Sequence, residues 1–344
     1  MDPEVTRTRT SDGRRLLLYG RHAPVPTPGP AAAWPPQARG LERRFNELRG
    51  EEVIYAAGRQ GRTHLPNAES CPLCPIKPGR APGEIPVESF EIAVFENRFP
   101  AFEPGEIGGA CEVVVYAAEH EASFATLPPD RAEDLMWVWR DRYAELGARP
   151  DVAYVMPFEN RGVEVGVTLH HPHGQVYAFP FVPPVAAAER KADERRGSCA
   201  VCAPLAAERE DGRRVVLTGE STLAYVPYAA RWPYEVHVAM SEHRASLIDC
   251  SAAELRDLAQ TLQEVTRGYD ALFERPFPYL LCVHQAPTDG RGDGHLHVEF
   301  YPPLRSPGRL KYTAGCEQGA GVFLNDTLPE RTALELRDAI ARAG

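Results

Sequence analysis

The chain has 344 residues, of which 38 are Lys or Arg and 48 are Asp or Glu, so its formal net charge is −10. Hydrophobic residues make up 43% and charged residues 25%, which is typical of a folded globular protein and excludes a disordered one. No apolar run approaches the roughly 20 residues that span a bilayer. The N-terminus lacks the apolar core of a signal peptide, and an acidic chain without a basic cluster is poorly suited to nucleic acid. These properties predict a cytoplasmic protein that binds neither membrane nor nucleic acid.

The chain is predicted to begin with an irregular arm and then to repeat itself. Residues 1–40 include a stretch rich in Pro and Ala, which is typical of an irregular arm. In the first half, 41–185, a Cys-x-x-Cys pair is followed by two histidines after 46 and a further 51 residues; in the second half, 186–344, the spacings are 41 and 52. This parallel argues against chance similarity. The two sets are Cys71, Cys74, His120 and His171, and Cys199, Cys202, His243 and His295.

The halves also match in their predicted secondary structure. The expected elements are, in chain order, a strand at 112–117, a helix at 130–146 and strands at 152–158 and 176–181, then a strand at 235–240, a helix at 251–273 and strands at 279–284 and 298–301. Each helix opens with a capping pattern, Asp130 with Glu133 and Ser251 with Glu254. This order favours an α+β fold, with helices packed on one face of an antiparallel sheet.

The cysteine pairs indicate metal binding or thiol redox chemistry. A chain of this size without a signal peptide needs no disulfide scaffold, and in a reducing compartment Cys-x-x-Cys serves one of these two chemistries. Nothing around Cys71 and Cys74 is typical of a thioredoxin-like βαβ unit, which favours metal.

The run Leu-His-His-Pro-His-Gly-Gln-Val at 169–176 is the most informative motif. Two of its histidines, His171 and His173, are spaced i and i+2, so on an extended segment they project to the same side. One can therefore hold a metal while the other faces a substrate. A surface loop is the alternative explanation, but the apolar strand residues around the run argue against a flexible tail.

Taken with other motifs, this run resembles the galactose-1-phosphate uridylyltransferase branch of the histidine-triad superfamily, over about residues 43–328. The motifs that carry the resemblance are His-Pro-His-Gly-Gln at 171–175, Arg-x-x-Arg at 59–62, Cys-Pro-Leu-Cys at 71–74, Phe-Glu-Asn at 95–97 and 158–160, Trp-Pro-Tyr-Glu at 232–235 and Phe-Tyr-Pro-Pro at 300–303. The resemblance implies two histidine-triad-like halves related by internal pseudo-duplication.

The resemblance also implies a two-step transfer in galactose metabolism. His173 would attack the α-phosphorus of UDP-glucose, expel glucose 1-phosphate and carry UMP until galactose 1-phosphate accepts it. A neutral imidazole is a good nucleophile near pH 7 and leaves readily from a phosphoramidate. Gln175 stands where the superfamily's hydrolases have histidine; its amide can hold phosphate oxygens but cannot relay a proton.

The resemblance assigns a closed, structural zinc site to Cys71, Cys74, His120 and His171. For the second half two metal sets remain open. Many family members hold iron or zinc with one Glu and three His, which correspond here to Glu189, His284, His297 and, in place of the last His, Glu299. Cys199, Cys202, His243 and His295 instead repeat the first set, and their soft thiolates favour zinc. We expect two zinc ions per chain, with the Glu189 set as the alternative.

Substrate contacts follow from the same resemblance. The matching positions are Arg59, Arg62, Asn97, Asn160, Thr168, Lys311 and Glu317. A solvated loop is the competing explanation for the two arginines, and a turn before Gly162 for Asn160. The sugar-contacting stretch departs from the family at Cys316 and at 322–326, which leaves the hexose and the base open.

The resemblance therefore implies a UDP-glucose–hexose-1-phosphate uridylyltransferase, and it also suggests a homodimer. A phosphorylase that acts on ADP-glucose or UDP-hexose with inorganic phosphate is the alternative within the superfamily. A non-catalytic, zinc-stabilised nucleotide-binding protein is the alternative from another class, although binding alone would not require His173 beside Gln175.

Overall fold

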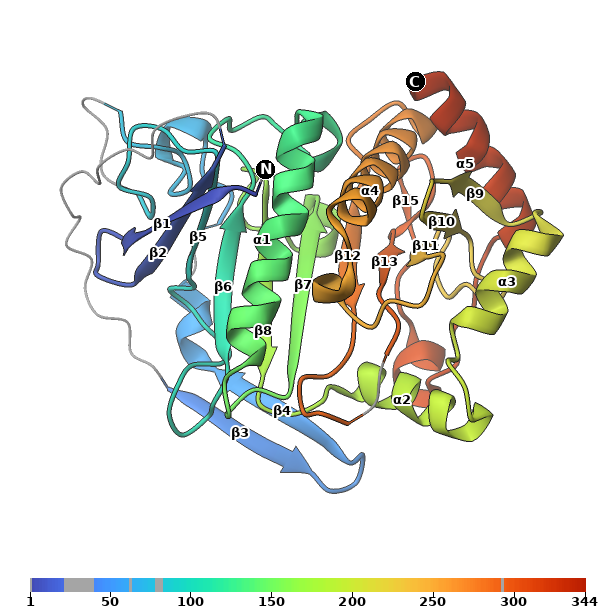
Figure 1. Cartoon of the computed structure of the whole chain (residues 1–344), viewed down its shortest axis with the longest axis horizontal. Helices are drawn as coiled ribbons and strands as arrows, with labels where there is room; N and C mark the ends of the chain where they lie inside the picture. Colours follow the sequence, from blue (N-terminus) through green and yellow to red (C-terminus); the bar gives the residue numbers. More distant parts are fainter. Residues whose placement is uncertain (1, 22–39, 62–63, 78–82, 292–293) are drawn as a thin grey trace. The chain divides into compact units, whose positions relative to one another are not determined.

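The computed structural model describes residues 2–21, 40–61, 64–77, 83–291 and 294–344. The chain forms two compact units, which are coloured mainly blue to green and yellow to red in Figure 1. The first comprises Met1–Pro157, Thr168–Ala188 and Pro287–Gly292, and the second comprises Phe158–Val167, Glu189–Ala286 and Asp293–Gly344. Both units combine antiparallel sheet with helices, so the predicted α+β class is confirmed. The predicted boundary between residues 185 and 186 stays a prediction.

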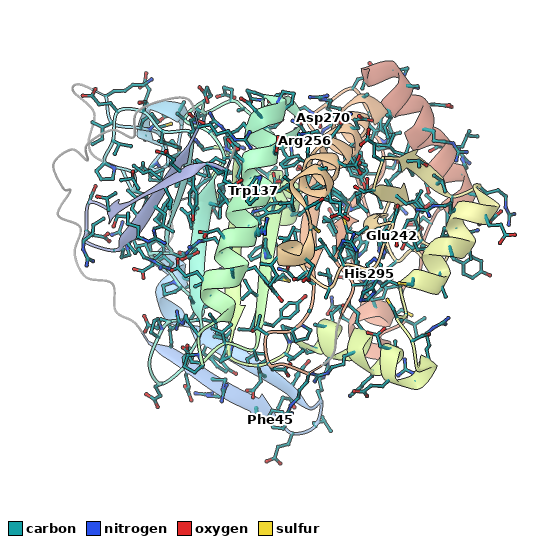
Figure 2. The ribbon with its side chains drawn as sticks, viewed as in Figure 1. Phe45, Trp137, Glu242, Arg256, Asp270 and His295 are labelled. Carbon is teal, nitrogen blue, oxygen red and sulfur yellow. The ribbon has the colours of Figure 1, made fainter. Side chains whose placement is uncertain are left out.

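The first unit has an antiparallel sheet of strand order β1-β2-β5-β6-β8. Helix α1 (Pro129–Gly147) contacts β8, and the segment after it leads into β7 (Tyr154–Arg161). A separate hairpin of two strands leaves Phe45 exposed to solvent (Figure 2). The strands are β1 (Glu4–Arg9), β2 (Arg15–Gly20), β3 (Leu41–Asn46), β4 (Glu51–Ala56), β5 (Ile92–Glu96), β6 (Ala110–Val115) and β8 (His173–Phe179).

The prediction of an irregular arm at 1–40 is wrong for residues 4–20, most of which form two strands. β1 and β2 form an antiparallel hairpin that adds to the sheet through β5. The apolar run Leu16-Leu17-Leu18 is almost completely buried, and this burial holds the hairpin in place. The prediction of an arm rested on the Pro- and Ala-rich composition and not on this short apolar run. The rest of the predicted arm, 22–39, lies outside the described residues.

The second unit carries the end of β7 and the strand order β7-β12-β13-β11-β10-β9, all antiparallel. Its helices are α3 (Cys202–Asp211), α4 (Ala252–Leu272) and α5 (Pro329–Ala343), and α2 (Pro184–Arg196) leads into the unit. Its strands are β9 (Val215–Thr218), β10 (Thr222–Tyr225), β11 (Val236–Met240), β12 (Tyr279–His284), β13 (His297–Tyr301) and the short pair β14 (Leu304–Ser306) and β15 (Arg309–Leu310). None of the helices in the described ranges is long and apolar enough to cross a membrane.

Helices cover both faces of the second sheet, which corrects the prediction of one covered face. Thr222 of β10 bonds to Thr261 of α4 on one side. The next residue, Leu223, packs with Leu205 of α3 on the other. Because successive side chains of a strand point to opposite faces, α3 and α4 lie on opposite sides of β10.

The two long helices start differently, although the sequence predicted the same cap for both. Ser251 caps α4: its hydroxyl accepts the Glu254 N–H, and the Glu254 carboxylate accepts the Ser251 N–H. Helix α1 begins instead at Pro129 with no side-chain cap, so the predicted Asp130–Glu133 cap is wrong. Proline at the first helical position has no N–H that needs a partner, which removes the need for a capping oxygen.

We expect Ser251→Ala to lower the free energy of unfolding by about 1 kcal/mol, because one N–H of the first turn loses its acceptor. The comparison variant is Asp130→Ala, which removes the acceptor of the adjacent Arg131 N–H but no N-cap bond of α1, so the change should be smaller. Urea unfolding followed by circular dichroism measures both. Equal losses in the two variants would contradict the assignment of the cap.

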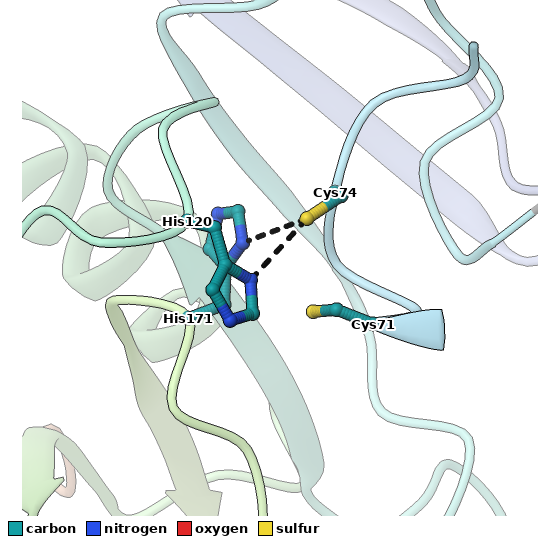
Figure 3. Close-up of side chains that lie close together, drawn as sticks. All are labelled: Cys71, Cys74, His120 and His171. Carbon is teal, nitrogen blue, oxygen red and sulfur yellow. Dashed lines mark hydrogen bonds between the residues drawn. The ribbon is translucent and has the colours of Figure 1, made fainter. Parts of the chain in front are cut away.

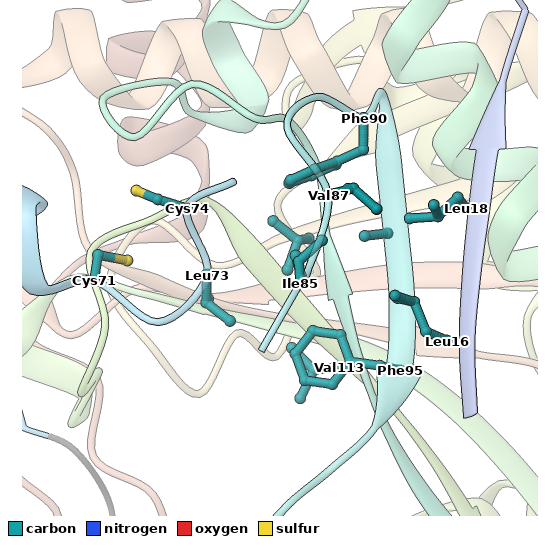
Figure 4. Close-up of a cluster of buried hydrophobic side chains, with 12 residues drawn as sticks. Leu16, Leu18, Cys71, Leu73, Cys74, Ile85, Val87, Phe90, Phe95 and Val113 are labelled. Atoms are coloured by element: carbon teal, nitrogen blue, oxygen red, sulfur yellow. The ribbon is translucent and has the colours of Figure 1, made fainter. Parts of the chain in front are cut away.

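A hydrophobic cluster joins the irregular segments 71–77 and 83–90 to the first sheet (Figure 4). Leu73, Ile85 and Val87 come from these two segments, and Leu16 and Phe95 come from strands. Cys71 and Cys74 are buried members of the same cluster, with 2% and 6% of their surface exposed. A metal held by these cysteines would therefore be anchored to the core of the unit.

Candidate active site and metal centres

The first predicted metal set comes together in the first unit. The Sγ atom of Cys74 lies 3.4 Å from Nδ1 of both His120 and His171, and the sulfur of Cys71 faces the same space (Figure 3). Ligand atoms about 2.0–2.3 Å from a tetrahedral ion lie about 3.5 Å apart. The four side chains therefore have the spacing that a shared metal ion requires.

The surroundings of this set determine the tautomer of His171 and the protonation of the Cys71 thiol. Nε2 of His171 lies 2.8 Å from the carbonyl oxygen of Ala117, so this nitrogen donates its proton there and Nδ1 presents a lone pair. Burial raises the pKa of the Cys71 thiol to about 11, which disfavours the thiolate in a site without a cation. A metal cation reverses that preference by binding the thiolate directly.

His173 is oriented by the residue that belongs to the metal set. Its Nδ1 donates a hydrogen bond of 2.8 Å to the carbonyl oxygen of His171, which leaves the lone pair of Nε2 free. Burial lowers the pKa of the His173 imidazole and so favours its neutral, nucleophilic form. A candidate metal ligand, just before β8, and an oriented imidazole, at the first residue of β8, thus lie two residues apart.

Strand β8 presents the neighbouring candidates on the same face. Its burial alternates, with His173, Gln175 and Tyr177 partly exposed and the residues between them buried. Nδ2 of Asn97 donates to Oε1 of Gln175 over 3.3 Å, so the amide nitrogen of Gln175 keeps its donors for a ligand. Arg59 donates to the Tyr177 hydroxyl over 3.1 Å. An imidazole, an amide and a guanidinium therefore gather along one face.

The second unit repeats the first metal set closely. Sγ of Cys202 lies 3.5 Å from Nδ1 of His243 and 3.4 Å from Nδ1 of His295, and Cys199 lies 3.5 Å from the latter nitrogen. Nε2 of His295 lies 3.0 Å from the Met240 carbonyl oxygen. This contact corresponds to the one between Nε2 of His171 and the Ala117 carbonyl oxygen in the first set. This second set is more exposed, since only His295 is buried.

The alternative metal set also comes together in the second unit. Glu189, His284 and His297 are close enough to share an ion. Glu299 lies beside the two histidines, with oxygens 3.5 Å from Nε2 of each. The described residues therefore contain both sets that the sequence left open.

The remaining predicted substrate residues fall in different places. Thr168, in the first unit, accepts the Leu65 N–H through its backbone. Asn160 lies on β7 opposite Leu280 of β12. Lys311 and Glu317 are buried in the second unit, where they pair with each other over 3.1 Å. The remaining member, Arg62, lies outside the described residues.

Sequence reasoning missed several groups that shape these sites. The carbonyl oxygens of Ala117 and Met240, which set the histidine tautomers, leave no trace in residue type. His237 was also missed: it lies 3.3 Å from Glu299 and 3.1 Å from Glu235. Its position two residues after Glu235, in a predicted strand, could have indicated it, because i and i+2 side chains share a face.

Comparison with known proteins defines the class and then the family. A solved structure described as a uridylyltransferase covers 87% of this chain and 98% of its own, with a TM-score of 0.75 and 30% identity, so the fold is that of a nucleotidyltransferase. Family models for galactose-1-phosphate uridyl transferase match at residues 102–183 (N-terminal domain) and 189–341 (C-terminal domain). The galactose-1-phosphate uridylyltransferase of Thermotoga maritima is 38% identical over 87% of this chain and 98% of its own length.

The chain belongs to the galactose-1-phosphate uridylyltransferase family. This membership confirms the predicted kind of enzyme, a nucleotidyltransferase of galactose metabolism. An ADP-glucose phosphorylase from Arabidopsis thaliana, solved with ADP-glucose, has a TM-score of 0.65 over 87% of this chain and 99% of its own. Because its identity is only 22%, this likeness concerns the fold alone.

Proposed function

We propose that this enzyme exchanges UMP between UDP-glucose and galactose 1-phosphate through a uridylyl-histidine on His173. In the first half-reaction Nε2 of His173 forms a bond to the α-phosphorus, and the bond from that phosphorus to the oxygen of glucose 1-phosphate breaks. In the second, a phosphate oxygen of galactose 1-phosphate takes the uridylyl group, which gives UDP-galactose and restores the imidazole. No net oxidation or hydrolysis occurs.

The observation that carries this proposal is the fixed orientation of His173. The 2.8 Å bond from its Nδ1 to the His171 carbonyl leaves Nε2 as the reacting nitrogen. As a phosphoramidate forms at Nε2, positive charge develops on the ring, and the same carbonyl stabilises it through the Nδ1 proton. The neighbouring Gln175 amide has donors available for the α-phosphate oxygens, because Asn97 occupies its oxygen.

We further propose zinc as the metal of both Cys₂His₂ groups. Two thiolates and two imidazoles are soft ligands that suit zinc, and four of them fill its tetrahedron. Bound zinc would supply cross-linking only, because no open position remains for a substrate. In the first unit Cys71 and Cys74 would join the irregular segment to His171, whose carbonyl positions His173.

Activity assays separate this function from its alternatives. Purified protein is incubated with UDP-glucose plus galactose 1-phosphate and, in parallel, with ADP-glucose plus inorganic phosphate. We expect UDP-galactose in the first mixture and little turnover in the second. Faster consumption of ADP-glucose with phosphate would support the phosphorylase instead, and turnover in neither mixture would support a non-catalytic nucleotide-binding protein. The predicted homodimer remains a proposal that light scattering on the purified protein tests.

We expect Gln175→His to shift the reaction from transfer toward hydrolysis. A histidine at this position can relay a proton to activate water, whereas the amide cannot. Positioned acid–base groups typically change rates by about 10²–10⁴-fold, so the hydrolysis-to-transfer ratio should rise by at least about tenfold. The ratio is measured from uridine monophosphate and UDP-galactose formed in one reaction.

Gln175→Asn is the matched control for that experiment. It keeps an amide but shortens it, so transfer should slow without a rise in the hydrolysis ratio. An unchanged ratio in Gln175→His would show that the role given to Gln175 is wrong.

A further inference from the structure

The face of β8 that carries His173 and Gln175 continues to Tyr177, a residue outside the motif at 171–175. Side chains at every second position of a strand point to the same side, so the three lie in one row. Four residues of extended strand place Tyr177 about 13 Å beyond His173. At that distance from the reacting nitrogen, a contribution of Tyr177 to transfer passes through another group.

That group is the guanidinium of Arg59, which the Tyr177 hydroxyl holds in place. Nη1 of Arg59 donates to this hydroxyl over 3.1 Å and to the carbonyl oxygen of Phe99 over 3.2 Å. Arg59 belongs to a short helical turn, Ala57–Gly61, which follows β4 outside the large sheet. Both acceptors are uncharged, so these two bonds fix the guanidinium without cancelling its positive charge. They therefore orient a cation beside this row of side chains.

The sheet in turn orients the Tyr177 hydroxyl. Cys111 of β6 is the direct cross-strand partner of Tyr177, and directly opposed side chains share a face. The Cys111 sulfur accepts two backbone N–H groups, over 3.4 and 3.3 Å, and hydrogen-bonds to the Tyr177 hydroxyl. Burial raises the pKa of the Cys111 thiol to about 11, so the thiol stays neutral near the arginine. A hydroxyl that donates its proton to sulfur presents its lone pairs to Arg59.

Aromatic packing holds the ring of Tyr177 independently of its hydroxyl. The ring centroid lies 6.1 Å from that of Phe102, edge to face, and 6.1 Å from that of Phe179. Contacts of this kind stabilise the ring whether or not it carries a hydroxyl. The role of the hydroxyl can therefore be tested separately from the packing.

A second chain of hydrogen bonds links Arg59 to Gln175. The carbonyl of Phe99 accepts from Arg59, and the N–H of Phe99 donates to Oδ1 of Asn97 over 2.8 Å. Nδ2 of Asn97 then donates to Oε1 of Gln175 over 3.3 Å. Arg59 is thus tied to β8 at two points, directly at Tyr177 and indirectly at Gln175. The guanidinium and the amide therefore keep a fixed position relative to each other.

We propose that Tyr177 is a positioning residue that holds Arg59 beside the phosphates of UDP-glucose. This inference rests on the proposed uridylyl transfer, in which Gln175 contacts the α-phosphate. A guanidinium that is already held in place loses less side-chain entropy when phosphate oxygens bind to it. Negative charge grows on glucose 1-phosphate as its bond to phosphorus breaks, so a fixed cation also favours the transition state.

A double-mutant cycle tests whether Tyr177 acts through Arg59. The variants are Tyr177→Phe, Arg59→Ala and the two together, assayed for transfer from UDP-glucose to galactose 1-phosphate. We expect Tyr177→Phe to lower kcat/KM by about 10–100-fold, since a displacement of about 1 Å at a positioned group can cost about 10²-fold. In the Arg59→Ala protein the same substitution should change kcat/KM by less than about twofold, because the group that it positions is gone.

Binding of UDP-glucose separates this inference from the proposed transfer reaction. Calorimetry on His173→Gly gives a true dissociation constant, because no uridylyl group can be transferred. Adding Tyr177→Phe should weaken UDP-glucose binding by about tenfold, which is the usual effect of losing one hydrogen bond to a charged group. If the wild type transfers nothing, the proposed function fails, and the same cycle on the dissociation constant then decides the role of Tyr177.

Tyr228→Phe is the matched control. Tyr228 is an exposed tyrosine of the second unit that also lies against an arginine, Arg214, and its variant should change neither kcat/KM nor binding. A purely structural role of Tyr177 would lower activity equally with and without Arg59. The proposal is overturned by such additive losses, by an unchanged kcat/KM in Tyr177→Phe, or by the absence of UDP-glucose binding.

Discussion

Replacing His173 with glycine is expected to abolish uridylyl transfer. The variant removes the imidazole nitrogen proposed to bond to phosphorus, and loss of a covalent nucleophile can lower kcat by about 10⁶-fold, as in a serine protease. Wild-type protein incubated with UDP-glucose alone should carry a uridylyl group that is labile in acid and stable in base. His173→Gly should carry none, because no phosphoramidate can form.

The same experiment contains its own controls. The proposed metal set contains His171 and not His173, so the metal content of His173→Gly should match that of the wild type. His170→Gly is the matched variant, since His170 is an exposed neighbour that does not belong to the metal set. His170→Gly should label normally. A uridylyl group on His173→Gly, or its absence from His170→Gly, would show that the nucleophile is assigned wrongly.

The elements that the sequence predicted well are those with strong periodicity or a repeated pattern. Helix α4 is found at Ala252–Leu272 against a predicted 251–273, and β12 at Tyr279–His284 matches its predicted range. The spacing of cysteines and histidines predicted both Cys₂His₂ groups, because a repeated spacing reflects a repeated fold. The prediction failed for β2, because the Pro- and Ala-rich composition of 1–40 was given more weight than a short apolar run. It also failed for the start of α1, where a proline at the first helical position takes the place of a capping side chain.

The sequence could predict which residues form the candidate site, but it could not predict their hydrogen bonds and distances. The position of His173 follows from its motif, yet its reactive nitrogen depends on a bond to a backbone carbonyl, which no residue type reveals. His237 and Glu299 are 62 residues apart in sequence, and their pairing depends on the register of β11 and β13, because a shift of one residue would place them on opposite faces. Contacts of this kind can be identified only from the structure of the folded sheet.

Cys71→Ser is expected to harm both stability and activity more than Cys199→Ser. Each variant should lose one zinc, so metal analysis should give two ions per chain for the wild type and one for each variant. Structural zinc contributes on the order of 10 kcal/mol to folding in small modules, and the cost should be smaller in a chain with a large core of its own. Both melting temperatures should fall, and the ranking of the two losses is the informative quantity.

Burial and connectivity set that ranking. Cys71 is 2% exposed within the hydrophobic cluster of the first unit, whereas Cys199 is only partly buried. The proposed metal of the first set would also hold His171, whose carbonyl orients His173. A displacement of about 1 Å at such a group can cost about 10²-fold in rate. Cys199 belongs to the unit that lacks His173, so transfer should persist in Cys199→Ser. Calorimetry with a transfer assay on both variants tests this, and equal activity losses would contradict the link between the first metal set and the nucleophile.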